Sequence, residues 1–291
     1  MALQPVSFLI GRCIEANGGV ILTGRPVVQL IIENGRCVGV ECADGSKYRA
    51  RKAVVSTLHV KHLVQMAPRD LWGDELLASV DLWQPEHAMF VFHYALSEAP
   101  KYRLADGSTV QSAEASIMER PESIFTLNAD QARGELTLDD YPLQVVHASV
   151  FDPTRAPPGC CTLKIEGSIP YALREGAAHW DVVKERVADT FLTRYLRHTT
   201  NLGKDKIMAK VTMSPIDIER MNPAMWRGSV HHRDKRWGVF APYRMPIPGL
   251  YQTGACTEAG GSVTGLPGRG AAAVILQDDG KTLEQVVARA A

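Results

Sequence analysis

The spacing of apolar residues predicts a helix and then antiparallel strands at the beginning of the chain. Residues 6–17 carry apolar side chains at helical spacing and end at Asn17-Gly18-Gly19, a favourable helix C-cap. Three strand-like runs follow, at 20–24, 27–33 and 36–43. The dipeptides Asn34-Gly35 and Asp44-Gly45 favour tight hairpin turns. We therefore predict a β-meander in this part of the chain.

A polar strand at 47–51, a lone apolar strand and a helical region come next. The run 53–57 is short, apolar and β-branched, as in strands that are buried within a parallel sheet. Residues 58–84 are leucine-rich and helical in character, and they end before Pro85. A helix, a hairpin ribbon and one buried strand do not make a self-sufficient domain. We therefore expect this sheet to take further strands from elsewhere.

The middle of the chain has the alternation of an antiparallel sheet. Residues 87–96 place Met89, Val91 and His93 on one face and aromatic residues on the other. Further strands are predicted at 143–151, 161–169 and 207–213, and helices at 180–198 and after Ser214. Residues 98–142 have weak periodicity, which indicates a mixture of strands and loops.

These elements predict an α/β fold class with two domains. The flanking parts, 1–84 and 236–291, are each α/β in character and incomplete alone, so we expect them to join into one partial domain. Residues 85–235 would form an inserted domain of antiparallel β-sheet plus helices.

Residues 249–280 carry the most informative local pattern. A short apolar strand leads through a glycine-dense loop into an alanine-rich helix. Glycines let backbone N–H groups approach a ligand, and a helix N-terminus favours an anionic or electron-rich one. The pattern therefore indicates a nucleotide-type cofactor, although ordinary turns also use glycine.

Composition narrows the function classes. Of 291 residues, 32 are Lys or Arg and 32 are Asp or Glu, so the formal net charge is zero and no nucleic-acid footprint is predicted. No apolar run approaches the roughly 18 residues of a membrane span. The N-terminus lacks the basic region and cleavage site of a signal peptide, and the six cysteines form no C-x-x-C pair. We expect a cytoplasmic protein with reduced thiols, and nothing indicates membrane association.

Several kinds of chemistry find no support in the motifs. The nine histidines form no zinc-binding pattern, so no metal site is predicted, and His231-His232 is best read as a polar loop. Ser262 is not in a G-x-S-x-G elbow, because Thr264 stands where the second glycine would be. His93, Tyr94 and His147 lie on predicted strands, where a packing role competes with catalysis.

Two segments together resemble a known family. The stretch IEANGGVILTGRPVVQLIIENGRCVGVECADGSKYRARKAVVST resembles the middle of phytoene desaturase-like FAD-dependent oxidoreductases, the group of carotenoid desaturases, carotenoid isomerases and retinol saturase-like enzymes. SPIDIER and the later PYRMPIPGLYQTGACTEAGGSVTGLPGRGAAAVIL resemble the C-terminal signature of that group. The resemblance implies that the partial α/β domain is an incomplete FAD-binding domain and that the inserted domain binds substrate.

The resemblance also implies site residues. Val27 would contact the adenine, Ser56 and Thr57 would close the strand that joins the nucleotide-binding sheet, and the remaining cofactor contacts lie in the glycine loop: Gly254, Ala255, Gly260, Gly261, Ser262, Val263 and Gly265. The helix from about Gly265 would point its N-terminus at the flavin ring and stabilise the anionic reduced form. If a proton must be moved, Tyr243, His93 and His147 are the catalytic candidates.

One part of the family pattern is missing. Members of the group begin with a β-α-β unit that carries G-x-G-x-x-G and holds the ADP moiety, and this sequence does not contain that motif. Either a complementing subunit or N-terminal-half polypeptide supplies it, or the chain is a truncated piece, or it works without tightly bound FAD. We expect FAD to bind only with a partner chain that supplies the dinucleotide-binding unit.

The leading hypothesis is a C-terminal portion or subunit of a flavin-dependent desaturase or dehydrogenase. It would act on a small apolar or ring-containing substrate by hydride transfer to flavin N5, in a cleft between the inserted domain and the glycine loop. Two alternatives remain open: a non-catalytic scaffold subunit that kept the fold without FAD, and a flavin-dependent non-redox isomerase.

Overall fold

The computed structural model describes residues 6–84, 88–229, 240–261 and 264–290 and divides the chain into two compact units. Unit 1 comprises residues 1–21 and 87–221, and unit 2 comprises residues 22–86 and 222–291. Each unit mixes helices and sheet, which confirms the predicted α/β fold class. No helix within the described ranges has the length and apolar character that crossing a membrane requires.

A five-stranded antiparallel sheet organises unit 1. Its strand order is β11-β5-β10-β9-β8, with β10 paired to β5 along their whole length. The strands of this unit are β5 (Ala88–Leu96), β6 (Tyr102–Arg103), β7 (Thr109–Val110), β8 (Glu114–Ile117), β9 (Leu143–Val146), β10 (Cys161–Ile169) and β11 (Ile207–Met213). Its α-helices are α1 (Val6–Ala16), α4 (Ser123–Arg133), α5 (Ala148–Phe151), α6 (Trp180–Leu196) and α7 (Pro215–Met221).

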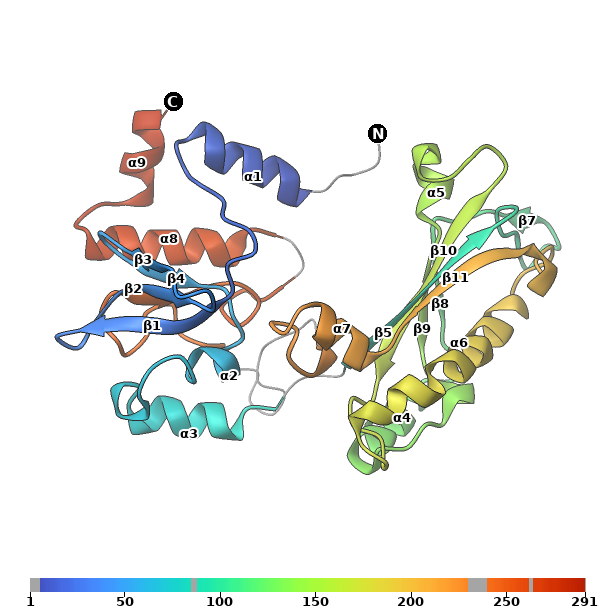
Figure 1. Ribbon diagram of the computed structural model, residues 1–291. Helices are drawn as coiled ribbons and strands as arrows, with labels where there is room; N and C mark the ends of the chain where they lie inside the picture. The colour runs from blue at the N-terminus through green and yellow to red at the C-terminus, as the bar shows by residue number, and fades with distance from the viewer. Residues whose placement is uncertain (1–5, 85–87, 230–239, 262–263, 291) are drawn as a thin grey trace. The chain divides into compact units, whose positions relative to one another are not determined.

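Helix α6 covers one face of this sheet (Figure 1). The even-numbered residues of β5 point to it, and the rings of Phe90 and Phe191 stack at 4.6 Å between centroids. Burial of these rings and of the rest of this core stabilises the unit, at about 25 cal/mol per Å² of apolar surface removed from water. The opposite face carries Val91 and His93, as the alternation over 87–96 predicts, and His93 is exposed there.

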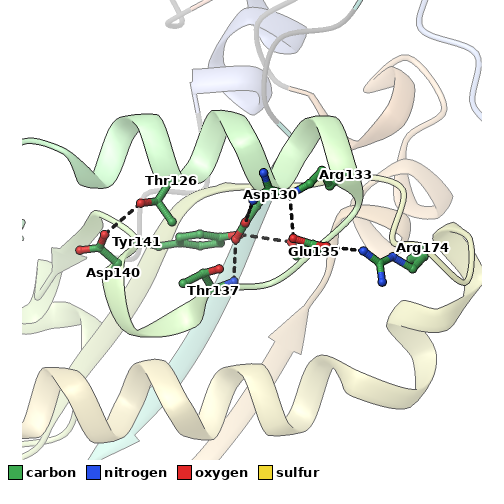
Figure 2. A network of polar contacts seen from close by, with 8 residues as sticks. All are labelled: Thr126, Asp130, Arg133, Glu135, Thr137, Asp140, Tyr141 and Arg174. Atoms are coloured by element: carbon green, nitrogen blue, oxygen red, sulfur yellow. Dashed lines mark hydrogen bonds and ion pairs between the residues drawn. The ribbon is translucent and has the colours of Figure 1, made fainter.

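A buried carboxylate fixes the segment between α4 and β9 (Figure 2). The side chain of Asp130 is fully buried and accepts hydrogen bonds from the backbone N–H of Thr137 at 2.6 Å and the hydroxyl of Tyr141 at 2.7 Å. Arg133 lies 3.4 Å from the same carboxylate and also pairs with Glu135. One side chain therefore satisfies the buried Tyr141 hydroxyl and a backbone N–H in a stretch that has little regular structure.

Unit 2 contains two small sheets. The strands β1 (Val27–Glu33), β2 (Arg36–Cys42) and β3 (Lys47–Arg49) form an antiparallel meander, and β4 (Val54–Ser56) pairs in parallel with β12 (Leu250–Gln252). The α-helices are α2 (Val60–Leu63), α3 (Asp74–Leu82), α8 (Leu266–Asp278) and α9 (Leu283–Ala290). Asn34 and Gly35 both have positive φ, at 50° and 72°, which is the hairpin turn that their sequence predicts.

The β4–β12 pair is open on one side. Across the far edge of β12, Gln252 donates its backbone N–H to Tyr243 and Met245 donates to Leu250, so that edge is covered. The backbone N–H and C=O groups of Val54 and Ser56 point toward β12 and pair with it. The N–H and C=O of Val55 therefore point to the opposite side of β4. Within the described residues this sheet consists of β4 and β12 alone, and the Val55 side chain is 46% exposed.

The structure corrects three details of the predicted elements. Residues 20–24 do not form a strand, because Gly24 turns the chain with a φ of 68°, and β3 takes the third place in the meander instead. The predicted strand 143–151 ends at Val146 and continues as α5, and 58–84 is broken into α2, a 3-10 turn and α3. The weakly periodic region 98–142 contains α4 as well as short strands.

Candidate functional site

The carboxyl ends of β4 and β12 lie next to each other in unit 2. Leu250 pairs with Val54 and Gln252 with Ser56, and the backbone N–H of Thr253 donates to the Ser56 carbonyl at 2.8 Å. Both runs are short and apolar and lead straight into polar residues, so the parallel pairing brings those residues to one edge. In α/β sheets this edge is where ligands bind.

Glycine shapes the backbone at this edge. Gly254 has a φ of 88°, and a Cβ added to it would lie 3.6 Å from the Thr57 carbonyl oxygen. Its own carbonyl accepts from the N–H of Thr257 at 3.1 Å and from the hydroxyl of Thr257 at 3.0 Å. The structure therefore brings together three of the predicted residues, Ser56, Thr57 and Gly254, and places Ala255, which is half-buried, directly after them.

Two buried polar atoms at the strand ends have no hydrogen-bond partner in the described part of the protein: the Gln252 side-chain oxygen Oε1 and the Thr253 hydroxyl Oγ1. The Gln252 amide nitrogen is held by the Leu58 carbonyl at 2.6 Å, which fixes the direction of the orphaned oxygen. Buried polar atoms are normally satisfied, so these two indicate a place where a polar ligand supplies the missing contacts.

The loop after β12 leads into the N-terminus of α8. Gly260 is buried with a φ of 80°, Gly261 is half-buried, and Gly265 caps the helix with a φ of 73° and open space on its Cβ side. The first N–H groups of α8 have no partners within the helix and carry the positive end of its dipole. Ser262 and Val263 lie outside the described residues.

Tyr243 packs between this loop and α8. Its hydroxyl donates to the Glu258 carbonyl, and the absence of a side chain at Gly270 leaves room for the ring on the helix. Burial raises the pKa of Tyr243 above its ordinary value, against the lowering effect of Thr257. The phenol is therefore protonated at neutral pH, and its hydrogen is already donated to the Glu258 carbonyl.

The remaining predicted residues lie elsewhere. Val27 begins β1 and pairs with Cys42, away from the ends of β4 and β12. His93 and His147 belong to unit 1, where His93 is exposed on the open sheet face and His147 is buried. Their predicted catalytic roles stay predictions.

His147 belongs to a buried group of aromatic side chains. Its Nε2 lies 2.8 Å from the Tyr195 hydroxyl and 3.4 Å from that of Tyr102, and the two hydroxyls are 3.2 Å apart. Burial lowers the pKa of His147 to about 4, although the backbone of Ser112 opposes this. The ring is therefore neutral at physiological pH and contributes packing and hydrogen bonds to the neighbouring hydroxyls.

This low pKa predicts an acid-sensitive unit 1. Unfolded His147 titrates near 6.5 and the folded ring near 4, so its stabilising contribution is complete above pH 6.5 and is lost as the pH falls toward 4. The loss amounts to about 3 kcal/mol, at about 1.4 kcal/mol per pKa unit. Urea unfolding of the wild type and of His147→Gln at pH 7 and pH 4 measures it, since glutamine keeps a hydrogen bond to Tyr195 but does not titrate. Equal pH dependence in both proteins would contradict the assignment.

Known proteins match this chain over most of its length. No protein-family model matches it. It is 28% identical to a limonene dehydrogenase subunit of Castellaniella defragrans over 286 residues, which cover 89% of this chain and 51% of that protein. It is 24% identical to the neurosporene-forming phytoene desaturase of Rhodobacter capsulatus, covering 92% of this chain and 51% of that enzyme.

The chain is a homologue of the phytoene desaturase-like oxidoreductases. It spans about half the length of the curated relatives it matches, which is consistent with correspondence to their C-terminal part. A solved structure of an oxidoreductase from Methanosarcina mazei has the same fold, with a TM-score of 0.54 at 15% identity, over 94% of this chain and 52% of that one. These findings confirm the resemblance, since the matching relatives are named as a dehydrogenase subunit and as desaturases.

The strand-end residues leave room and polar contacts for a ligand. Gly254 leaves the backbone free of a side chain beside Thr57, and the orphaned oxygens of Gln252 and Thr253 offer polar contacts. Within the described residues, no three His, Cys, Asp or Glu side chains come together as a metal site would require. Gln252, Thr253 and Thr257 were not among the residues predicted from the sequence. The sequence could have indicated these residues, because polar residues at the carboxyl end of a buried strand line the edge of such sheets where ligands bind.

Proposed function

We propose that this chain forms the flavin-ring end of a flavin-dependent oxidoreductase that desaturates or dehydrogenates a small apolar molecule. The observation that carries the proposal is the edge formed by β4 and β12, where Gly254 lies against Thr57 beside two unpartnered buried oxygens. When bound, flavin supplies an acceptor for the hydride that leaves the substrate. The homology to a dehydrogenase and to desaturases supports this reaction type.

The chain's own residues would bind and orient the cofactor. Gly254 and Ala255 would let the backbone approach it closely, with Ser56 and Thr57 on the neighbouring strand end. Gln252 is rigidly held through Leu58, so its free oxygen can accept one hydrogen bond without losing side-chain entropy. This arrangement positions a ligand by fixed backbone rather than by mobile side chains.

The N-terminus of helix α8 would stabilise negative charge on the bound cofactor. Its N-terminus follows the glycine loop, with Gly265 at the cap and Pro267 in the first turn, where a missing N–H costs nothing. The unpaired N–H groups there favour negative charge by about 0.3–1 kcal/mol, and by more where water is excluded. A flavin that becomes anionic on reduction would be stabilised by this end of the helix.

The open edge of β4 supports a partner chain. A parallel pair of three-residue strands is not stable alone, and parallel strands are normally covered on both sides. Val55 offers an outward N–H and C=O and an exposed apolar side chain, which an additional strand of another polypeptide segment would cover. We propose that this segment belongs to the dinucleotide-binding unit, either as an N-terminal-half polypeptide or as a complementing subunit.

Absorption spectroscopy of the protein purified from its native host, with the chains that remain bound to it, tests the proposal. We expect the bands of oxidised flavin and stoichiometric FAD on denaturation. Val55→Pro should lose both partner and flavin, because proline removes the outward N–H but leaves the Val54 and Ser56 bonds to β12.

The matched control is Val55→Thr, which keeps the N–H and the β-branched shape, and it should retain partner and flavin. A colourless wild-type preparation that takes up no added FAD contradicts the proposed function and favours the scaffold alternative. A yellow Val55→Pro protein with its partner still bound would show that the β4 edge is not the docking strand.

A further inference from the structure

The open face of the unit 1 sheet carries a groove. It has a volume of about 600 Å³ and lies between the strands and the segment formed by α5 and the following 3-10 turn. Its lining residues are His93, Tyr94, Val146, Ala148, Thr154, Arg155, Thr162, Leu163 and Lys164. This volume is in the range of small-molecule sites, roughly 300–1,000 Å³.

One row of side chains crosses the floor of the groove. Lys164 is paired with His93 of β5 on one side and with Val146 of β9 on the other, and His93 is also paired with Val211 of β11. Residues in register on one face are close neighbours, about 4.5–5.5 Å apart at Cβ. The row therefore places an imidazole between an aliphatic side chain and a lysine.

The charged groups of the groove are already paired. The Lys164 ammonium lies 2.8 Å from the Glu166 carboxylate, and the Arg155 guanidinium lies 3.2 Å from that of Asp152. Asp152 also accepts a hydrogen bond from the Thr154 hydroxyl at 2.6 Å. A charged ligand would have to break one of these pairs and lose its own hydration, which is costly.

His93 is an uncommitted polar group of the groove, and the Thr162 hydroxyl is another. Among the described residues no hydrogen bond of the His93 ring is found. Burial and the nearby Lys164 charge lower the pKa of His93, and Glu166 opposes them more weakly. The neutral ring has one N–H donor and one nitrogen acceptor, so it can bond either a hydroxyl or a carbonyl oxygen.

We propose that this groove binds a small molecule with an apolar body and a single uncharged oxygen group, which hydrogen-bonds to His93. A bound hydrocarbon would cover the imidazole without giving it a hydrogen-bond partner. A bound carboxylate or ammonium would compete with the Lys164–Glu166 and Arg155–Asp152 ion pairs. This inference rests on the proposed function. It adds the class of substrate, which is an alcohol or carbonyl compound with an apolar skeleton.

Titration with three probes of one shape tests the inference: cyclohexanol, methylcyclohexane and cyclohexanecarboxylate. We expect cyclohexanol to bind most tightly and to shift the proton-NMR signal of the His93 ring, which His93→Phe identifies by its loss. His93→Phe should weaken cyclohexanol binding by about fivefold, as the loss of one hydrogen bond predicts.

Two control variants separate the hydrogen bond from general packing. His93→Gln keeps a donor and an acceptor and should retain most of the affinity. His198→Phe changes an exposed histidine after α6 and should change nothing. Equal or tighter binding of methylcyclohexane or cyclohexanecarboxylate, or binding of none of the three probes, would overturn the inference.

Flavin occupancy distinguishes this inference from the proposed function. If wild type binds cyclohexanol through His93 but takes up no FAD, the groove stands as an alcohol or carbonyl site and the oxidoreductase proposal fails. If wild type contains FAD and fails to bind cyclohexanol, the substrate class is wrong and the oxidoreductase proposal is unaffected.

Discussion

Gly254→Ala is expected to lower the flavin affinity of the assembled protein by at least about tenfold while leaving it folded. At a φ of 88° an L-amino acid is strained by roughly 1–2 kcal/mol, so the backbone relaxes away from its position beside Thr57. The added methyl group also enters the space over the strand ends where a ligand would approach. Flavin absorbance and fluorescence titration with FAD measure the change.

Gly280→Ala is the matched control for this substitution. Gly280 follows α8 with a φ of 72° and has no atom within 4 Å of its Cβ position, so the two variants carry similar backbone strain. Only Gly254 lies at the carboxyl ends of β4 and β12. Equal loss of flavin in both variants would show that backbone strain lowers stability in general. Full retention of flavin in Gly254→Ala would show that Gly254 is not part of the cofactor site.

Asp130→Ala is expected to destabilise unit 1 by about 1–3 kcal/mol, the range found when a buried hydrogen-bond donor loses its acceptor. The substitution removes the acceptor of the Thr137 N–H and leaves the hydroxyl of the fully buried Tyr141 with only the Glu135 carbonyl, at 3.4 Å. Each unsatisfied buried donor costs about 1–3 kcal/mol. Urea unfolding monitored by circular dichroism measures the change in free energy.

Glu135→Ala provides the control from the same network. Glu135 bridges Arg133 and Arg174 with its side chain about one-third exposed, and such surface ion pairs contribute about 0–1 kcal/mol. A large loss in this variant and a small one in Asp130→Ala would show that the surface pairs, rather than the buried carboxylate, hold the segment between α4 and β9.

Strong periodicity made part of this fold predictable. The strand 161–169 and the helix beginning at Trp180 match their predicted positions, because alternate residues of β10 and one stripe of α6 are buried in a single core. Helix α4 was not predicted, since its sequence SIFTLNADQAR exposes Ile124 and Phe125 and thus lacks a clean apolar stripe. Its stability comes from the Asp130 contacts, which sequence spacing does not reveal.

The candidate site was predictable to the extent that glycine marks it. The glycine-dense loop after a short strand indicated a cofactor, whereas Gly254, Ser56 and Thr57 were named as contacts through the family resemblance. The pairing of these two distant segments could be expected only from the family resemblance. The position of Gln252 and Thr253 at the end of a short strand was readable from the sequence, but the lack of partners for their buried oxygens depends on three-dimensional packing.

The β4–β12 pair also sets the order in which the chain can fold during its synthesis. The hydrogen bond from Gln252 to Leu58 joins residues 194 positions apart. Nearly all of unit 1 comes from the continuous stretch 87–221, which a ribosome delivers before β12. Because long-range pairing is slow and late, residues 22–86 must wait with their apolar side chains uncovered until the C-terminal segment emerges. This waiting period is when a chaperone would be needed most.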